Sequence, residues 1–169
     1  EFGPLSQRVF EVDGRTFRFV AHHTGTEAEL TELVRDVEKI VKVEGAIFGE
    51  YPAYETGRYT FLADYLPWAN GYGMEHRNST VITSSASIRS NRNGLLDTVA
   101  HEFFHGWNVE RIRPRSLEPF DFERANMSSE LWLAEGFTQY YGPLSLSRAG
   151  IESLSETLET MNGLIQSIV

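Results

Sequence analysis

The chain has 169 residues, of which 41% are hydrophobic and 23% charged, and this is long enough for one domain with a buried core. It has no cysteine, which excludes disulfides, thiol catalysis and cysteine-rich zinc sites. Its 24 acidic and 15 Lys and Arg residues give a net charge of −9, which disfavours a general binder of nucleic-acid phosphates. No uninterrupted apolar run approaches the roughly 20 residues that cross a bilayer, so we expect a soluble protein without a membrane span, in the cytoplasm, the periplasm or outside the cell.

The N-terminal part begins with a β-hairpin pattern and continues into an amphipathic helix. The hairpin is predicted over residues 8–20, where an Asp-Gly pair supplies the positive φ of a tight turn. Thr26 is the expected N-cap of the helix, with Glu29 as its capping-box partner and Gly45 as its end. We expect the first 25 residues to be the end of a preceding β region.

Further along the chain, the pattern changes from β-rich to helical. Strands are predicted over 58–66 and 74–84, with a glycine-containing loop between them. Helices are predicted over 94–109, 129–147 and 150–169, with a Gly-Pro pair as a kink or break in the second of them. The last helix reaches the end of the chain with apolar residues and no cap, which indicates a chain truncated at its C-terminus.

An HExxH sequence, His101-Glu102-Phe103-Phe104-His105, lies inside the helix predicted over 94–109. Two histidines at i and i+4 share one face of a helix, so both rings can reach one zinc ion at about 2.0–2.1 Å. Glu102 lies beside them and can take a proton from the water in the open coordination position, then return it to the leaving amine. The alternative is a surface helix with two histidines and no metal, which the apolar side of this helix disfavours.

A catalytic zinc site needs a third protein ligand and one open position. Glu135 is the best candidate, because it is the single acidic residue in an apolar or neutral segment, LWLAEGFTQYY, over 131–141. A buried carboxylate requires a cation nearby, and zinc would supply it. The alternative is an ion pair between Glu135 and Arg111 or Arg113. At helical spacing from the ligands, Thr138, Gln139 and Asp97 are candidates to hydrogen-bond them.

The strand that begins near Gly73 is the other candidate functional element. Glycines before a strand let a second backbone approach closely, and an edge strand binds an extended peptide through main-chain hydrogen bonds. Gly73 and Met74 are therefore candidate substrate-binding residues, and Glu75 is a candidate partner for a substrate amine. The alternative for Glu75 is an ordinary solvent-facing carboxylate.

Three segments resemble, in the right order, the glycyl aminopeptidase family, which is peptidase family sixty-one among the gluzincin zinc peptidases. They are GYGMEHRNST over 71–80, HEFFHGWNVERIRP over 101–114 and LWLAEGFTQYY over 131–141. The first is also similar to the GxMEN strand of aminopeptidase N relatives, although His76 replaces the final Asn. The resemblance covers about residues 9–147. It implies an α+β, thermolysin-like zincin fold: a mixed sheet whose edge strand faces the HExxH helix, and a following helix that carries the third ligand.

The same resemblance implies that residues 1–169 form a metallopeptidase catalytic domain. It implies Zn²⁺ held by His101, His105 and Glu135, with Glu102 as the general base that acts on a zinc-activated water. Glu75 would bind the α-amine, so the substrates would be peptides with a free N-terminus, with Gly or Ala as the first residue. The family also suggests a PDZ module in the full-length protein.

An oxyanion-stabilising side chain and two competing functions stay open at this point. Tyr140 and Tyr141 are the candidates within the chain for the oxyanion, and both are equally explained as core aromatic residues. A thermolysin-like endopeptidase would not need Glu75 as an amine anchor. A catalytically inactive zinc-containing peptide-binding module would not need Glu102 as a base.

Overall fold

The computed structural model describes residues 3–167; residues 1–2 and 168–169, where the predicted β region begins and the last predicted helix ends, lie outside this range. The strands form one sheet in the order β1-β2-β3-β5-β4. Pairing is parallel between β2, β3 and β5 and antiparallel at both edges, so the predicted mixed sheet is confirmed. The strands are β1 (Ser6–Val12), β2 (Arg15–His23), β3 (Arg58–Tyr65), β4 (Tyr72–His76) and β5 (Ser79–Ser84).

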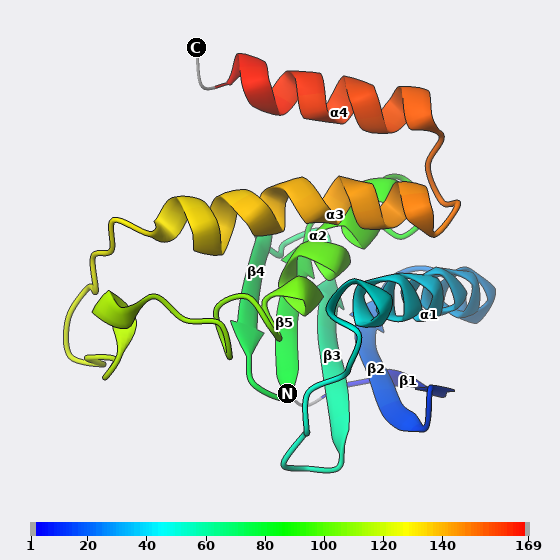
Figure 1. Cartoon of the computed structure of the whole chain (residues 1–169). Helices are drawn as coiled ribbons and strands as arrows, with labels where there is room; N and C mark the ends of the chain where they lie inside the picture. Colours follow the sequence, from blue (N-terminus) through cyan, green and yellow to red (C-terminus); the bar gives the residue numbers. More distant parts are fainter. Residues whose placement is uncertain (1–2, 168–169) are drawn as a thin grey trace.

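The helices lie on one side of this sheet (Figure 1). Helices α1 and α2 contact the sheet, α3 packs on α2, and α4 packs on α3 as the outermost element. The architecture is therefore α+β. The helices are α1 (Glu27–Phe48), α2 (Arg92–Phe104), α3 (Phe137–Arg148) and α4 (Leu154–Gln166).

Helix α1 begins as predicted and ends later than predicted. The Thr26 hydroxyl accepts a hydrogen bond from the Glu29 N–H, and the Glu29 carboxylate accepts one from the Thr26 N–H, so the capping box is confirmed. Gly45 does not end the helix. Gly45 lies inside the helix. A glycine is needed at this position because the Tyr51 ring occupies the place of a Cβ atom. The helix ends at Gly49, which has φ 75°.

Two further predictions on local structure were wrong. The strand predicted over 74–84 is a hairpin, because Arg77-Asn78 forms a turn between β4 and β5 and leaves β4 at the sheet edge. The Gly-Pro pair does not break α3: the helix continues through Pro143, and Gly142 lies against Asp97 of α2. The hairpin β1–β2, expected to end a preceding β region, is continuous with the sheet through β3.

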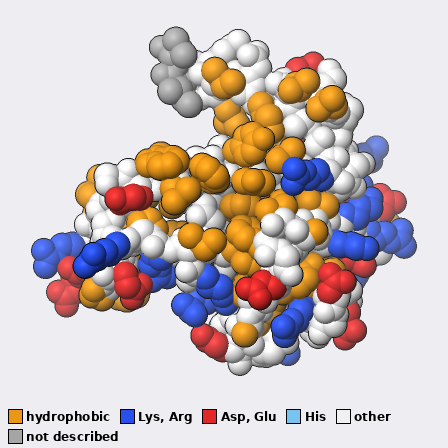
Figure 2. All heavy atoms as spheres, viewed as in Figure 1, with side chains coloured by type: hydrophobic (Ala, Val, Ile, Leu, Met, Phe, Trp, Pro, Cys, Tyr) orange, Lys and Arg blue, Asp and Glu red, His pale blue; other side chains and the backbone are white. Residues whose placement is uncertain are grey.

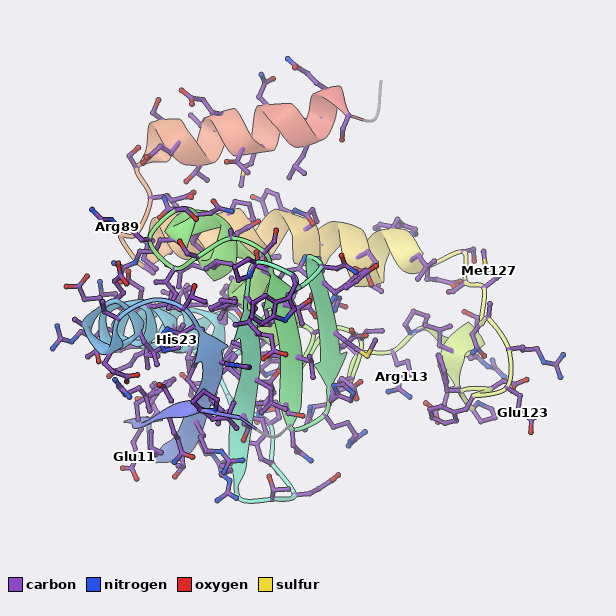
Figure 3. All side chains as sticks on the ribbon, turned by 180° about the vertical axis from the view of Figure 1, so that it is seen from behind. Glu11, His23, Arg89, Arg113, Glu123 and Met127 are labelled. Carbon is purple, nitrogen blue, oxygen red and sulfur yellow. The ribbon has the colours of Figure 1, made fainter. Side chains whose placement is uncertain are left out.

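Aromatic side chains fill the core between the sheet and the helices. Phe17, Tyr59, Phe61 and Phe103 are fully buried and pack largely edge to face around Phe103. A long connection, on which Arg113, Glu123 and Met127 lie, projects from the body between α2 and α3 (Figure 3). Hydrophobic side chains are exposed along α3 and α4 (Figure 2). Within residues 3–167, no helix combines the length and apolarity needed to cross a membrane.

Candidate metal centre

Helix α2, which carries candidate site residues, is firmly packed in the core. Leu96, Val99 and Phe103 on one side of the helix are fully buried against the sheet and α1. His101 and His105 lie toward α3, and Glu102 lies toward β4. The helix is shorter than predicted, because the chain turns after His105 and brings the Asn108 carbonyl back onto the His105 ring.

Three predicted ligands converge on one point. The Nε2 atoms of His101 and His105 are 3.1 Å apart. One carboxylate oxygen of Glu135 lies 3.4 Å from the first and 3.5 Å from the second. Glu135 comes from a single π-helical turn (Trp132–Gly136) that leads into α3. Such turns insert one extra residue into a helix and occur often at functional sites.

These distances fit a zinc ion. Neighbouring ligand atoms around a tetrahedral zinc, at about 2.0–2.2 Å from the metal, lie about 3.3–3.5 Å apart. The three observed separations are within a few tenths of an ångström of that value. Two ring nitrogens and a carboxylate oxygen are all groups that bind metals, so a cluster this close is compatible with a metal ion between them.

Hydrogen bonding fixes which nitrogen of His105 faces the site. Its Nδ1 lies 2.8 Å from the Asn108 carbonyl oxygen, which can only accept, so Nδ1 carries the proton. The Nε2 lone pair is thereby left for a metal. The Thr138 hydroxyl, predicted as a possible partner of the ligands, lies 3.5 Å from the same Nδ1.

Asn108 connects the two segments that supply the ligands, and sequence reasoning missed it. Besides the contact to His105, its side-chain amide donates to the carbonyls of Leu133 and Ala134 at 2.9 and 3.1 Å, and to the Thr138 hydroxyl. These carbonyls belong to the turn that carries Glu135. The only signal in the sequence was an Asn three residues after the second His of the motif.

Glu102 is almost fully buried, at 6% exposure, beside β4. An added Cβ at Gly73 would overlap its carboxylate, so the absence of a side chain at Gly73 makes room for Glu102. Burial raises the pKa of Glu102 to about 7, against the opposing effect of His101 and His105. A carboxyl group in this range can both accept and return a proton near neutral pH.

Contacts between Glu135 and the two histidines shift the pKa values at the centre. Hydrogen bonding to His101 and His105 holds the pKa of Glu135 well below its usual range. For His105, burial lowers the pKa, but the contacts with Glu135 and the Asn108 carbonyl outweigh it and raise the pKa overall. A carboxylate that stays ionised beside two ring nitrogens is suited to hold a cation.

Glu75 on the edge strand β4 also reaches this centre. Its carboxylate, that of Glu102 and a ring nitrogen of His105 lie within 4.8 Å of one another. Glu75 is therefore not simply a solvent-facing side chain. Its neighbour Met74 exposes 58% of its surface, and the Met74 carbonyl accepts a hydrogen bond from the Thr80 hydroxyl at 2.9 Å.

Tyr140, Tyr141 and Asp97 are the remaining candidates. Tyr141 stacks on Phe104 with ring centroids 4.8 Å apart, and Tyr140 is 49% exposed beside it. Burial raises the pKa of Asp97, which lies against α3 at Gly142.

The predicted alternative for Glu135, an ion pair with an arginine, was wrong. Arg113 pairs with Glu110 and Glu118, and Arg111 donates to the carbonyls of Gly106 and Arg77. The nitrogen partners of Glu135 are the two histidines of α2.

The chain is similar to known proteins in sequence and in fold. Residues 94–169, which include most of α2 and the turn that carries Glu135, match the profile of the M61 glycyl aminopeptidase family. The matched range does not include Glu75. The fold is similar to a crystal structure of an aminopeptidase N family protein from Idiomarina loihiensis, with a TM-score of 0.81 and 27% sequence identity, over 92% of this chain and 27% of that one.

The curated relatives that the chain matches are also named as aminopeptidases. The chain is 32% identical over 115 residues to leucine aminopeptidase 2 of Aspergillus fumigatus, and 34% identical over 110 residues to that of Emericella nidulans. These alignments cover 68% and 64% of the chain but only 15% of either relative. The comparisons confirm the resemblance to glycyl aminopeptidases that the three motifs predicted.

Proposed function

We propose that this chain, similar to glycyl aminopeptidases, forms the catalytic site of a zinc-dependent aminopeptidase with a thermolysin-like arrangement. His101, His105 and Glu135 would hold the zinc ion. The observation that carries the proposal is the position of Glu75: an edge-strand carboxylate lies within 4.8 Å of the carboxylate of Glu102 and of His105. A peptide held by its amino end at Glu75 has its first peptide bond beside Glu102 and the three ligands.

The residues of the chain divide the chemistry between them. A zinc ion bound there supplies Lewis-acid chemistry, by polarising the scissile carbonyl and activating a water molecule. Glu102 accepts a proton from the attacking water and delivers it to the departing amine. Its burial keeps competing solvent away from that transfer.

Glu75 sets the point of cleavage. A substrate α-amine is cationic below a pKa of about 8, and a carboxylate partner in a partly desolvated groove contributes on the order of 2–3 kcal/mol. Because the amine ends the substrate chain, only the first peptide bond reaches the catalytic groups. An edge strand such as β4 can hold the rest of an extended peptide through backbone hydrogen bonds.

A small first residue is part of the proposal. The description of the matching family supports glycine, whereas the curated relatives are named leucine aminopeptidases. Rates on matched glycyl, alanyl and leucyl reporter substrates separate these options, and a leucyl preference would revise the substrate class while leaving the reaction unchanged.

The decisive experiment compares free and blocked substrates on the zinc-loaded full-length protein. N-acetylation removes the charge that Glu75 binds, so kcat/KM for the acetylated peptide should fall at least about tenfold, equivalent to roughly 1.4 kcal/mol. Glu75→Gln should shrink this difference by slowing the free-amine substrate. Glu11→Gln, an exposed carboxylate on β1, is the matched control and should keep it.

The outcomes separate the alternatives. Equal rates on free and acetylated peptides would contradict the amine anchor and indicate an endopeptidase. Zinc binding without hydrolysis of either peptide would indicate a zinc-containing peptide-binding module.

A further inference from the structure

A cavity of about 260 Å³ lies between β4, β5 and the first half of α2. Its walls include Gly71 just before β4, Gly73 within β4, Ser84 at the end of β5, the α2 N-cap Asn91, and Leu95 and Thr98 from α2. Gly71 has no side chain to fill the space, whereas the place of a side chain at Gly73 is taken by the Glu102 carboxylate. At Gly71 an added Cβ would meet nothing within 4 Å.

The cavity begins where the metal centre ends. Along the edge strand the order is Glu75, then Gly73 beside Glu102, then Gly71 at the cavity. Along α2 the order is His105, then Glu102, then Thr98 at the cavity. Both walls of the groove therefore run from the proposed amine anchor, past the general base, into this space.

We propose that this cavity receives the side chain of the substrate's second residue and selects uncharged polar side chains. The inference rests on the proposed function, because it takes Glu75 as the site of the substrate amine. An extended peptide advances about 3.3–3.4 Å per residue and alternates its side chains. With the amine at Glu75 and the first carbonyl near Glu102, the second residue lies beside Gly73, at the mouth of the cavity.

The lining favours polar and neutral groups. The Thr98 hydroxyl donates to the Gly94 carbonyl at 3.1 Å, so its oxygen can accept a hydrogen bond from a ligand. The Ser84 hydroxyl oxygen accepts from the Ala86 N–H at 3.1 Å, so its proton can be donated. None of the described residues that line the cavity is charged. A charged second residue would therefore find no counter-charge among the lining residues.

The test uses four peptide amides, Ala-Gly, Ala-Ser, Ala-Asn and Ala-Asp, on the zinc-loaded full-length protein. Asn and Asp have nearly the same shape, so their comparison isolates charge. One additional hydrogen bond should raise kcat/KM for Ala-Ser and Ala-Asn about three- to tenfold above Ala-Gly. Ala-Asp should be cleaved at least about tenfold more slowly than Ala-Asn.

Gly71→Val tests the cavity itself. The valine side chain enters open space, and the φ of Gly71 lies outside the left-handed region, so the substitution fits the backbone. The ratio of kcat/KM for Ala-Ser over Ala-Gly should fall to about one. Gly163→Val makes the same change on α4, where an added Cβ also meets nothing, and should leave the ratio as it is in the unmodified protein.

Peptide affinity separates the two levels of the proposal. Calorimetric binding of Ala-Asn amide and Ala-Asp amide to the Glu102→Gln variant needs no turnover. A tenfold difference in Kd supports the cavity even where no peptide is hydrolysed, an outcome that overturns the proposed function alone. Equal Kd values, no binding, or equal kcat/KM for all four peptides overturns the cavity, and turnover with equal rates leaves the aminopeptidase proposal standing.

Discussion

The protein holds the two segments that supply the candidate zinc ligands in different ways. Helix α2 is anchored by fully buried side chains such as Leu96 and Phe103, which pack against the sheet and α1. The third-ligand segment, which we define as Trp132–Gly136 and the first turn of α3, is largely exposed. Trp132 shows 66% of its surface and Phe137 46%, and the Glu135 side chain is 54% exposed.

This difference assigns separate tasks to the two segments. The core fixes the two histidines and Glu102, so their geometry is set when the protein folds. Glu135 is fixed instead by polar contacts, through Asn108 and through the histidines themselves. We therefore expect substitutions in α2 to change either chemistry or folding, and substitutions in the third-ligand segment to change metal binding first.

The largest effect is expected from the same substitution made in each segment. Glu102→Gln should retain zinc and lower kcat about a hundred- to ten-thousandfold, because the amide cannot accept a proton. Glu135→Gln should instead lose most of the zinc at equal total metal. Turnover and bound metal, measured on both full-length variants, check this division. Near-normal kcat in Glu102→Gln would remove Glu102 from the proposed chemistry.

A second pair tests the difference in packing. Phe103→Ala empties a fully buried site among Phe17, Tyr59 and Phe61, and should lower the free energy of unfolding by about 3–5 kcal/mol. Phe137→Ala, at a half-exposed site, should lower it by about 1 kcal/mol. Urea unfolding monitored by circular dichroism measures both. Equal losses would contradict the view that only α2 is anchored by the core.

Asn108 joins the two segments, so a substitution there tests whether the third-ligand segment depends on the contact. Asn108→Ala removes the donors to Leu133 and Ala134, so zinc affinity should fall about ten- to a hundredfold, as expected for groups that orient ligands. Competition with a chelator measures this affinity. Asn162→Ala on the exposed side of α4 is the control and should leave it unchanged. An unchanged affinity in Asn108→Ala would mean that Glu135 needs no such support.

The smallest effect concerns the buried end of α3. Glu44 of α1 is fully buried, and burial raises its pKa well above 4.5, with Ser145 of α3 offsetting part of this effect. Because the folded pKa is the higher one, stability is greatest below the unfolded pKa and declines as pH rises toward the folded pKa. Glu44→Gln should therefore be more stable than the unmodified protein at pH 8, by roughly 1 kcal/mol, and no more stable at pH 4.

Thermal unfolding across this pH range checks the sign. Glu38→Gln, an exposed position on the same helix, should show no such pH-dependent gain. A gain that grows toward acidic pH would contradict the assignment to Glu44.

Local sequence was enough wherever the physical cause is local. The capping box at Thr26 depends on residues three apart, and the shared face of His101 and His105 depends on one helical turn, so both follow from spacing alone. Glu135 was recognisable as the lone acid in an apolar segment, although its side chain is 54% exposed and not buried as that argument assumed. The Asp-Gly turn of the first hairpin has the same local origin.

Features that depend on contacts between distant parts of the chain could be recognised only in the folded structure. Gly45 is needed inside a helix because the Tyr51 ring occupies the space of its side chain, and Gly73 is needed because Glu102, 29 positions later in the sequence, does the same. The role of Asn108 depends on carbonyls of a turn that approaches it only after folding. Residue type and short spacing along the chain were enough to pick out the candidate site residues, because the capacity to bind a metal or move a proton belongs to the side chain itself. The fold decided what holds them in place, because packing and hydrogen bonding join segments that the sequence keeps apart.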